Sequence, residues 1–161
     1  FIGAAAFNQE LNGWKVEKNV TNMAEMFKEA AAFNQKLNGW NVSNVTTMQS
    51  MFYEAAAFNQ DLNGWNVSNV TTMNCMFKCA AAFNQELNGW NVSNVTNMEF
   101  MFRANYSSDM PSAFNQKLNG WNISKVTRKY AMFGGASAMR EANKPKQTLC
   151  SECNARLCQI M

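Results

Sequence analysis

The stretch LNGWNVSNVTTMQSMFYEAAAFNQ, residues 37–60, decides the fold, because close copies of it fill most of the 161-residue chain. Its tryptophan recurs at positions 14, 40, 65, 90 and 121, and the phenylalanine of its Phe-Asn-Gln triplet recurs at 7, 33, 58, 83 and 114. Both series advance by 26, 25, 25 and 31 residues. A period of this length indicates a stack of coils, each of which buries its apolar face against its neighbours.

Two patterns inside the repeat predict an α/β solenoid. Met48, Met51, Phe52 and Ala55 fall at i, i+3, i+4 and i+7, which is the spacing of one face of a short helix. Residues 41–46, Asn-Val-Ser-Asn-Val-Thr, are rich in β-branched side chains and follow Asn-Gly, a pair that readily adopts the positive φ angles of tight turns. We therefore expect a turn and a short strand, and stacking at about 4.8 Å would pair the strands of successive coils into a parallel sheet.

Stacked copies of one repeat place identical residues on top of one another. The expected apolar columns are those of Trp14, Trp40, Trp65, Trp90 and Trp121, and of Phe33, Phe58, Phe83 and Phe114. A further column is polar and consists of Asn41, Asn66, Asn91 and Asn122, or of the neighbouring Asn44, Asn69 and Asn94. We interpret it as a ladder of side-chain amides that satisfies backbone groups at the turn, because a buried polar group without a partner is costly.

The repeat also sets the expected domain boundaries. Residues 1–139 hold about five coils and begin in mid-coil, because Phe1 occupies the slot of Phe27. The pattern decays after Phe133, and residues 140–161 are expected to form a C-terminal cap and a basic tail that carries cysteines. No apolar run approaches the roughly 20 residues that a membrane helix needs, so we expect no membrane span.

The Phe-Asn-Gln, Trp-x-Val-Ser-x-Val-Thr and Met-x-x-Met-Phe elements recur in fixed order over residues 1–139. In this they resemble the BspA-like repeat of bacterial surface proteins, a relative of the leucine-rich repeats. The resemblance implies leucine-rich-repeat-like coils, a non-catalytic interaction or adhesion module, and a cell-surface or extracellular location. Two features depart from that family: the acidic residue common after the tryptophan is Asn or Lys here, and the cysteine-bearing tail lies outside the pattern.

The composition argues against an enzyme. The chain has no histidine, which removes the usual general base and the commonest metal ligand. The slot after Phe-Asn-Gln alternates in charge, which is typical of a solvent-facing row, and it holds Glu10, Lys36, Asp61, Glu86 and Lys117. We therefore expect no catalytic residues and no cofactor. The positive charge is too diffuse for the continuous basic stripe of a nucleic-acid-binding protein.

The five cysteines leave three states open. Cys75 and Cys79 lie at slots that should face outward, and Cys150, Cys153 and Cys158 lie in the tail. Cys75, Cys79, Cys150 and Cys153 are candidate zinc ligands, since four thiolates suffice for a structural site. All five are disulfide candidates in an oxidising compartment, and free thiols are the third possibility.

These observations predict a non-enzymatic repeat module that binds other proteins. The candidate contacts lie where the repetition fails: at the open N-terminal edge, in the insertion and in the tail. They are Phe1, Asn105, Tyr106, Asp109, Met110, Lys144, Lys146 and Arg156. One alternative is a structural accessory subunit of a large complex, such as an organellar membrane assembly, which would contact the N-terminal edge or the tail. Another is a thiol redox or zinc-binding protein that uses the cysteines.

Overall fold

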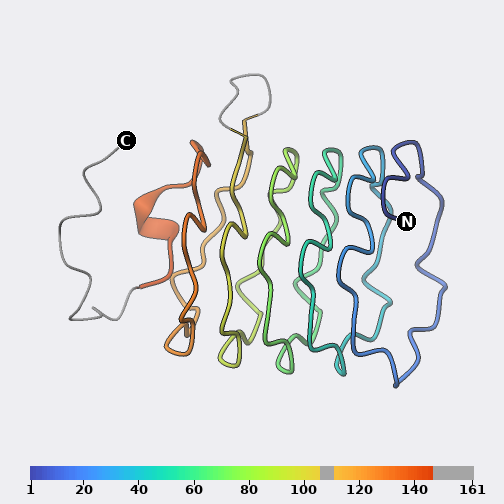
Figure 1. Cartoon of the computed structure of the whole chain (residues 1–161), viewed down its shortest axis with the longest axis horizontal. Helices are drawn as coiled ribbons and strands as arrows, with labels where there is room; N and C mark the ends of the chain where they lie inside the picture. Colours follow the sequence, from blue (N-terminus) through green and yellow to red (C-terminus); the bar gives the residue numbers. More distant parts are fainter. Residues whose placement is uncertain (106–110, 147–161) are drawn as a thin grey trace.

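The computed structural model of the chain describes residues 1–105 and 111–146. The coils lie side by side along the long axis of the molecule (Figure 1), and each brings the same part of the repeat next to its copy in the next coil. Isolated parallel β-bridges mark this register, and they join Asn22 to Thr47, Thr47 to Thr72, Thr72 to Asn97 and Asn97 to Arg128. The repeat therefore stacks with its equivalent positions in line.

The backbone of the coils is neither helical nor stranded. Among the described residues, the one helical element is the 3-10 helix η1, Glu141–Asn143, and pairing of the β type is confined to the isolated bridges. The prediction of an α/β solenoid, in which each leucine-rich-repeat-like coil carries a short strand and a short helix, is therefore wrong. Turns and irregular segments build each coil, and hydrogen bonds between coils replace those that a helix or sheet would make.

Residues 48–55 and their equivalents in the other coils are here named the methionine segments. The expected helix is absent from them because every second N–H group donates to the next coil. Ser50 and Glu54 have φ angles of 52° and 56°, a left-handed conformation that interrupts a right-handed helix. The N–H groups of Met48, Ser50, Phe52 and Glu54 donate to the carbonyls of Thr72, Asn74, Met76 and Lys78 at 2.9 to 3.1 Å. The apolar spacing nevertheless marks the buried face, since Met48, Met51, Phe52 and Ala55 are all 0% exposed.

The expected strand at residues 41–46 is replaced by a turn. The N–H of Val45 donates to the carbonyl of Val42 within the same coil at 3.0 Å. Only at the end of this segment does a backbone N–H reach the preceding coil, from Thr46 to the carbonyl of Thr21 at 2.8 Å. The β-branched residues here serve the core, because Val42 and Val45 both point into it and are buried.

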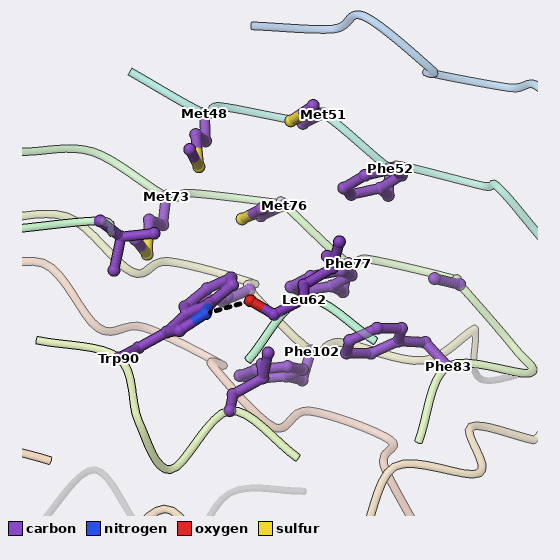
Figure 2. Packing of buried hydrophobic residues seen from close by; sticks show 14 of the residues in the cluster. Met48, Met51, Phe52, Leu62, Met73, Met76, Phe77, Phe83, Trp90 and Phe102 are labelled. Atoms are coloured by element: carbon purple, nitrogen blue, oxygen red, sulfur yellow. Dashed lines mark hydrogen bonds between the residues drawn. The ribbon is translucent and has the colours of Figure 1, made fainter. Parts of the chain in front are cut away.

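Two columns of phenylalanine rings run through the core. The rings of Phe52, Phe77 and Phe102 are stacked with centroids 5.6 Å apart, and Phe27 and Phe133 continue this column at either end. The second column consists of Phe7, Phe33, Phe58, Phe83 and Phe114 at 5.9 to 6.0 Å. The columns touch each other, with the Phe77 and Phe83 centroids 4.0 Å apart (Figure 2).

The tryptophans tie each coil to the one before it. Four of them are buried, and each donates its Nε1–H to a leucine carbonyl of the preceding coil at 2.8 to 3.1 Å; they are Trp40, Trp65, Trp90 and Trp121. Figure 2 shows this bond between Trp90 and Leu62. Trp14, in the first coil, is 54% exposed, so it does not share the burial expected of its column.

The main amide ladder lies on the asparagine of Phe-Asn-Gln rather than on the row expected. Asn8, Asn34, Asn59 and Asn84 each use Oδ1 to accept the backbone N–H of the equivalent asparagine in the next coil, at 2.9 Å. The row expected to form the ladder is exposed, and its Oδ1 atoms accept from the N–H two residues ahead in the same coil; it consists of Asn41, Asn66, Asn91 and Asn122. The alternative row donates Nδ2 to a carbonyl of the preceding coil at 2.7 to 2.9 Å, and it consists of Asn44, Asn69 and Asn94.

The Asn-Gly turns differ from expectation as well. Among the described glycines only Gly3 and Gly135 have positive φ, so the glycines of the five Asn-Gly pairs do not supply the left-handed conformation. At Gly39 the backbone packs closely against Asn12, which leaves no room for a side chain. A Cβ atom there would lie 3.0 Å from both the main-chain and the side-chain oxygen of Asn12. At Gly64 a Cβ atom would meet nothing within 4 Å.

Alanine substitutions at these two glycines should therefore change stability in opposite directions. Gly39→Ala is expected to lower the free energy of unfolding by about 1–3 kcal/mol, because the methyl group overpacks against Asn12. Gly64→Ala is expected to raise it by about 0.4–1 kcal/mol, because it restricts the unfolded chain without a clash. Urea unfolding of both variants measures the difference. Since both glycines lie in the same Leu-Asn-Gly-Trp sequence, shifts of equal sign would contradict the packing explanation.

Candidate binding surface

Alternating cations and aromatic rings cross the outer side of the methionine segments. We name this set the cation–aromatic row, and it consists of Lys28, Tyr53, Lys78, Phe100, Arg103 and Tyr130. Lys78 Nζ lies 4.9 Å from the centroid of Tyr53 and 5.8 Å from that of Phe100. Lys28 Nζ lies 5.8 Å from Tyr53, and the guanidinium carbon of Arg103 lies 5.2 Å from Phe100. Tyr130 meets Phe100 edge-on at 5.5 Å and is 73% exposed.

The repeat itself places these side chains in line. Lys28, Tyr53, Lys78 and Arg103 occupy one slot of the repeat, so stacking in register sets them side by side. Phe100 joins them from a neighbouring slot whose residue has a left-handed backbone, with φ at 57°. The contacts between rings and cations follow because cations favour the electron-rich face of an aromatic ring.

Acidic side chains flank the row, so its charge is mixed. Lys28 Nζ lies 3.6 Å from Glu25 and 3.9 Å from Glu29. Near the other end, Arg128 lies 2.6 Å from Glu99. These pairs are partly exposed, and pairs at a protein surface add little to stability.

A hollow of about 200 Å³ opens beside the row and is lined by Tyr53, Glu54, Lys78, Cys79, Arg103, Ala104 and Asn105. A hydrogen bond to Glu54 raises the pKa of Tyr53 to about 12, and partial burial acts in the same direction. Because this pKa lies above the ordinary value for tyrosine, the Tyr53 hydroxyl stays neutral throughout the physiological pH range. The hollow can therefore offer a partner an uncharged hydroxyl, cations and the Glu54 carboxylate together.

Cys75 and Cys79 are free thiols in the structure, so they form no disulfide with each other. Both have positive φ, and burial raises the pKa of each thiol. A raised pKa lowers the thiolate fraction at neutral pH, which disfavours nucleophilic or redox chemistry. Within residues 1–105 and 111–146, no group of three or more His, Cys, Asp or Glu side chains could hold a metal ion. Cys150, Cys153 and Cys158 lie outside the described residues.

The partner contacts expected from the sequence are scattered over the described chain. Phe1 is 37% exposed and stacks on Phe7 and Phe27 at the N-terminal end of the phenylalanine columns, and Asn105 is exposed at the hollow beside Cys79. Lys144 pairs with Glu141 and lies 5.6 Å from the ring of Phe133, while Lys146 is exposed. The remaining candidates, Tyr106, Asp109, Met110 and Arg156, lie outside the described residues. Among the expected contacts in residues 1–105 and 111–146, Asn105 is the one that lines the hollow.

None of the residues of the cation–aromatic row was among the contacts expected from the sequence. The signal was available, because one slot reads Lys28, Tyr53, Lys78 and Arg103 while the core slots around it hardly change. The approach of Phe100 and Tyr130 could not be read in the same way, since these rings belong to different slots. Their contact depends on the left-handed backbone at Phe100.

The comparison with protein families agrees with the repeat. A family described as "Mycoplasma protein of unknown function, DUF285" matches residues 1–110 and, in a second overlapping match, residues 64–149. The chain belongs to this family. No curated protein and no solved structure matches it. In the part of the chain that the structure describes, no helix is long and apolar enough to cross a bilayer.

Proposed function

We propose that this DUF285 repeat is a non-enzymatic protein-binding module that uses the cation–aromatic row as its contact surface. The observation that carries the proposal is the row itself, in which Tyr53, Lys78 and Phe100 are held together by ring and cation contacts on a constant core. Tyrosine and arginine are enriched at protein interfaces, where they provide large contact areas. An adhesive surface module of the BspA-like kind is the corresponding biological role.

The stacked core supports this role by fixing the row before a partner arrives. Each methionine segment is bonded to the next through alternate backbone N–H groups, so the side chains of the row sit on a continuous hydrogen-bonded frame. Preorganised side chains lose less conformational entropy on binding than side chains on a mobile loop. The row can therefore contribute its aromatic area and its charges at a lower entropic cost.

A non-catalytic role also fits the chemistry of the surface. The half-buried thiols of Cys75 and Cys79 have raised pKa values, which favours their protonated form. The acidic groups near the row pair with lysine or arginine or form a hydrogen bond with Tyr53, and these contacts bring no two carboxyl groups together. Neither arrangement resembles an acid–base pair or an activated nucleophile.

The proposal predicts that the row carries most of the binding to the native partner. The triple variant Tyr53→Ala, Lys78→Ala, Tyr130→Ala is expected to lose at least about tenfold in affinity, which corresponds to about 1.4 kcal/mol. A photo-crosslinker placed at Tyr53 in the native source would identify the partner, and its affinity for each variant would then be measured. Co-migration with a large complex would assign the accessory-subunit role instead of adhesion.

The matched control removes three exposed charges from a different corner of the coils: Lys36→Ala, Glu86→Ala, Lys117→Ala. These residues follow the Phe-Asn-Gln triplet and lie outside the row. The control should bind as the parent chain does. Unchanged affinity of the row variant, or an equal loss in the control, would show that the row is not the contact surface.

A further inference from the structure

Five turns share the sequence Leu-Asn-Gly-Trp, but the fold gives their Asn-Gly pairs different hydrogen bonds. They are residues 11–14, 37–40, 62–65, 87–90 and 118–121. In an Asn-Gly pair, the backbone nitrogen of glycine can attack the side-chain carbonyl carbon of asparagine. Because the neighbouring residues are the same in all five turns, their intrinsic reactivity is equal. Any difference in rate must come from the folded structure.

Hydrogen bonds restrain four of the five turns. The N–H of Gly39 donates to Asn12 Oδ1 at 2.9 Å, and the N–H of Gly89 donates to Asn63 Oδ1 at 2.8 Å. Each bond acts on two turns, because it holds the attacking nitrogen of one and the side-chain amide of the other. Turns 37–40 and 87–90 therefore have a restrained nucleophile, and turns 11–14 and 62–65 have a restrained electrophile.

The last turn has neither restraint. Among the described residues, no hydrogen bond is made by the side chain of Asn119 or by the N–H of Gly120, and both residues are exposed. The turn is still closed by the N–H of Trp121, which donates to the carbonyl of Leu118 at 3.0 Å. Gly120 lacks a left-handed φ and has no Cβ atom to obstruct the attack. The two reacting groups are thus both free and adjacent.

We propose that Asn119 is a site of spontaneous deamidation and the first of the five Asn-Gly pairs to convert. A bond forms between the Gly120 nitrogen and Cγ of Asn119, and the bond from Cγ to Nδ2 breaks. Nδ2 leaves as ammonia, with the proton of the Gly120 amide, and a succinimide ring remains. Water then opens the ring at either carbonyl, which gives aspartate or isoaspartate. Both products add a carboxylate to this turn, and isoaspartate also lengthens the main chain by one methylene group.

Ageing of the intact chain in mildly alkaline buffer tests the proposal. Proteolysis followed by mass spectrometry would give a conversion rate for each asparagine, and an isoaspartyl methyltransferase would count the isoaspartate. Asn119 is expected to convert at least about fivefold faster than Asn38 and Asn88, the factor that matches one hydrogen bond of about 1 kcal/mol. Equal rates at Asn119 and Asn88 in the folded chain would overturn the proposal.

Two controls separate the fold from the sequence. In concentrated denaturant the five rates should converge, because the four-residue context is the same; a ranking that persists there would also overturn the proposal. The variant Asn63→Ala removes the acceptor of the Gly89 N–H, so Asn88 should then approach the rate of Asn119. Asn38 should not change in this variant, since its restraint comes from Asn12.

Discussion

The variant Phe77→Ala is expected to lower the free energy of unfolding by about 3–5 kcal/mol. Phe77 lies in the middle of the stack, where its ring is 5.6 Å from the rings of both Phe52 and Phe102 and 4.0 Å from that of Phe83. Truncation removes contacts in three successive coils at once. The cavity should not collapse, because intercoil hydrogen bonds on either side of it fix the spacing. Urea unfolding followed by circular dichroism gives the change.

Two other aromatic residues supply the controls. Phe133 ends the same column and stacks on Phe102 alone, so Phe133→Ala should cost about half as much. Tyr130 is mostly exposed, and Tyr130→Ala should change stability by no more than about 0.5 kcal/mol. If Phe77→Ala costs no more than Tyr130→Ala, the stacked phenylalanine columns are not the main source of stability.

The buried face of the repeat could be predicted from the sequence, but its backbone could not. The spacing of Met48, Met51, Phe52 and Ala55 identifies side chains that share a side, and all four are buried. The same spacing suits a helix and also a chain that alternates local turns with bonds to the next coil. Within residues 48–55 the left-handed residues that decide between them are Ser50 and Glu54, neither of which is the glycine or asparagine typical of such a conformation. Glycine fills the slot of Glu54 only in the outermost coils, at Gly3 and Gly135, and both of these glycines are left-handed.

The polar columns show a second limit. Each coil offers several asparagines at the same period, and repetition alone does not reveal which of them bridges coils. The structure places the main ladder on Asn59 and its equivalents, where Asn59 Oδ1 accepts both the N–H of Asn84 and the Nε2–H of Gln85 from the next coil. On the surface, breaks in the repeat predicted Phe1 and Asn105 as partner contacts. The ring contacts of the cation–aromatic row could not be predicted in this way, because they depend on how neighbouring coils align.

Asn59→Ala is the second substitution expected to have a large effect, with a loss of about 2–3 kcal/mol in the free energy of unfolding. Asn59 Oδ1 accepts the backbone N–H of Asn84 at 2.9 Å and Nε2 of Gln85 at 3.1 Å. Alanine provides no acceptor, so the part-buried N–H of Asn84 would lose its partner. An unsatisfied backbone donor is costly, and it would lie in the middle of a ladder that joins consecutive coils. Thermal and urea unfolding of the purified variant measure the loss.

Two comparisons isolate the ladder from the general effect of losing an asparagine. Asn59→Asp keeps an oxygen in the position of Oδ1, and a carboxylate accepts hydrogen bonds at least as strongly as an amide does, so most of the stability should remain at neutral pH. Asn66→Ala removes an exposed acceptor that serves only the N–H of Ser68 in its own coil, and it should cost about 0.5–1 kcal/mol. Losses of equal size in Asn59→Ala and Asn66→Ala would show that bonds between coils count no more than bonds within them. A larger loss in Asn59→Ala, largely restored in Asn59→Asp, would assign the stability to the shared acceptor oxygen.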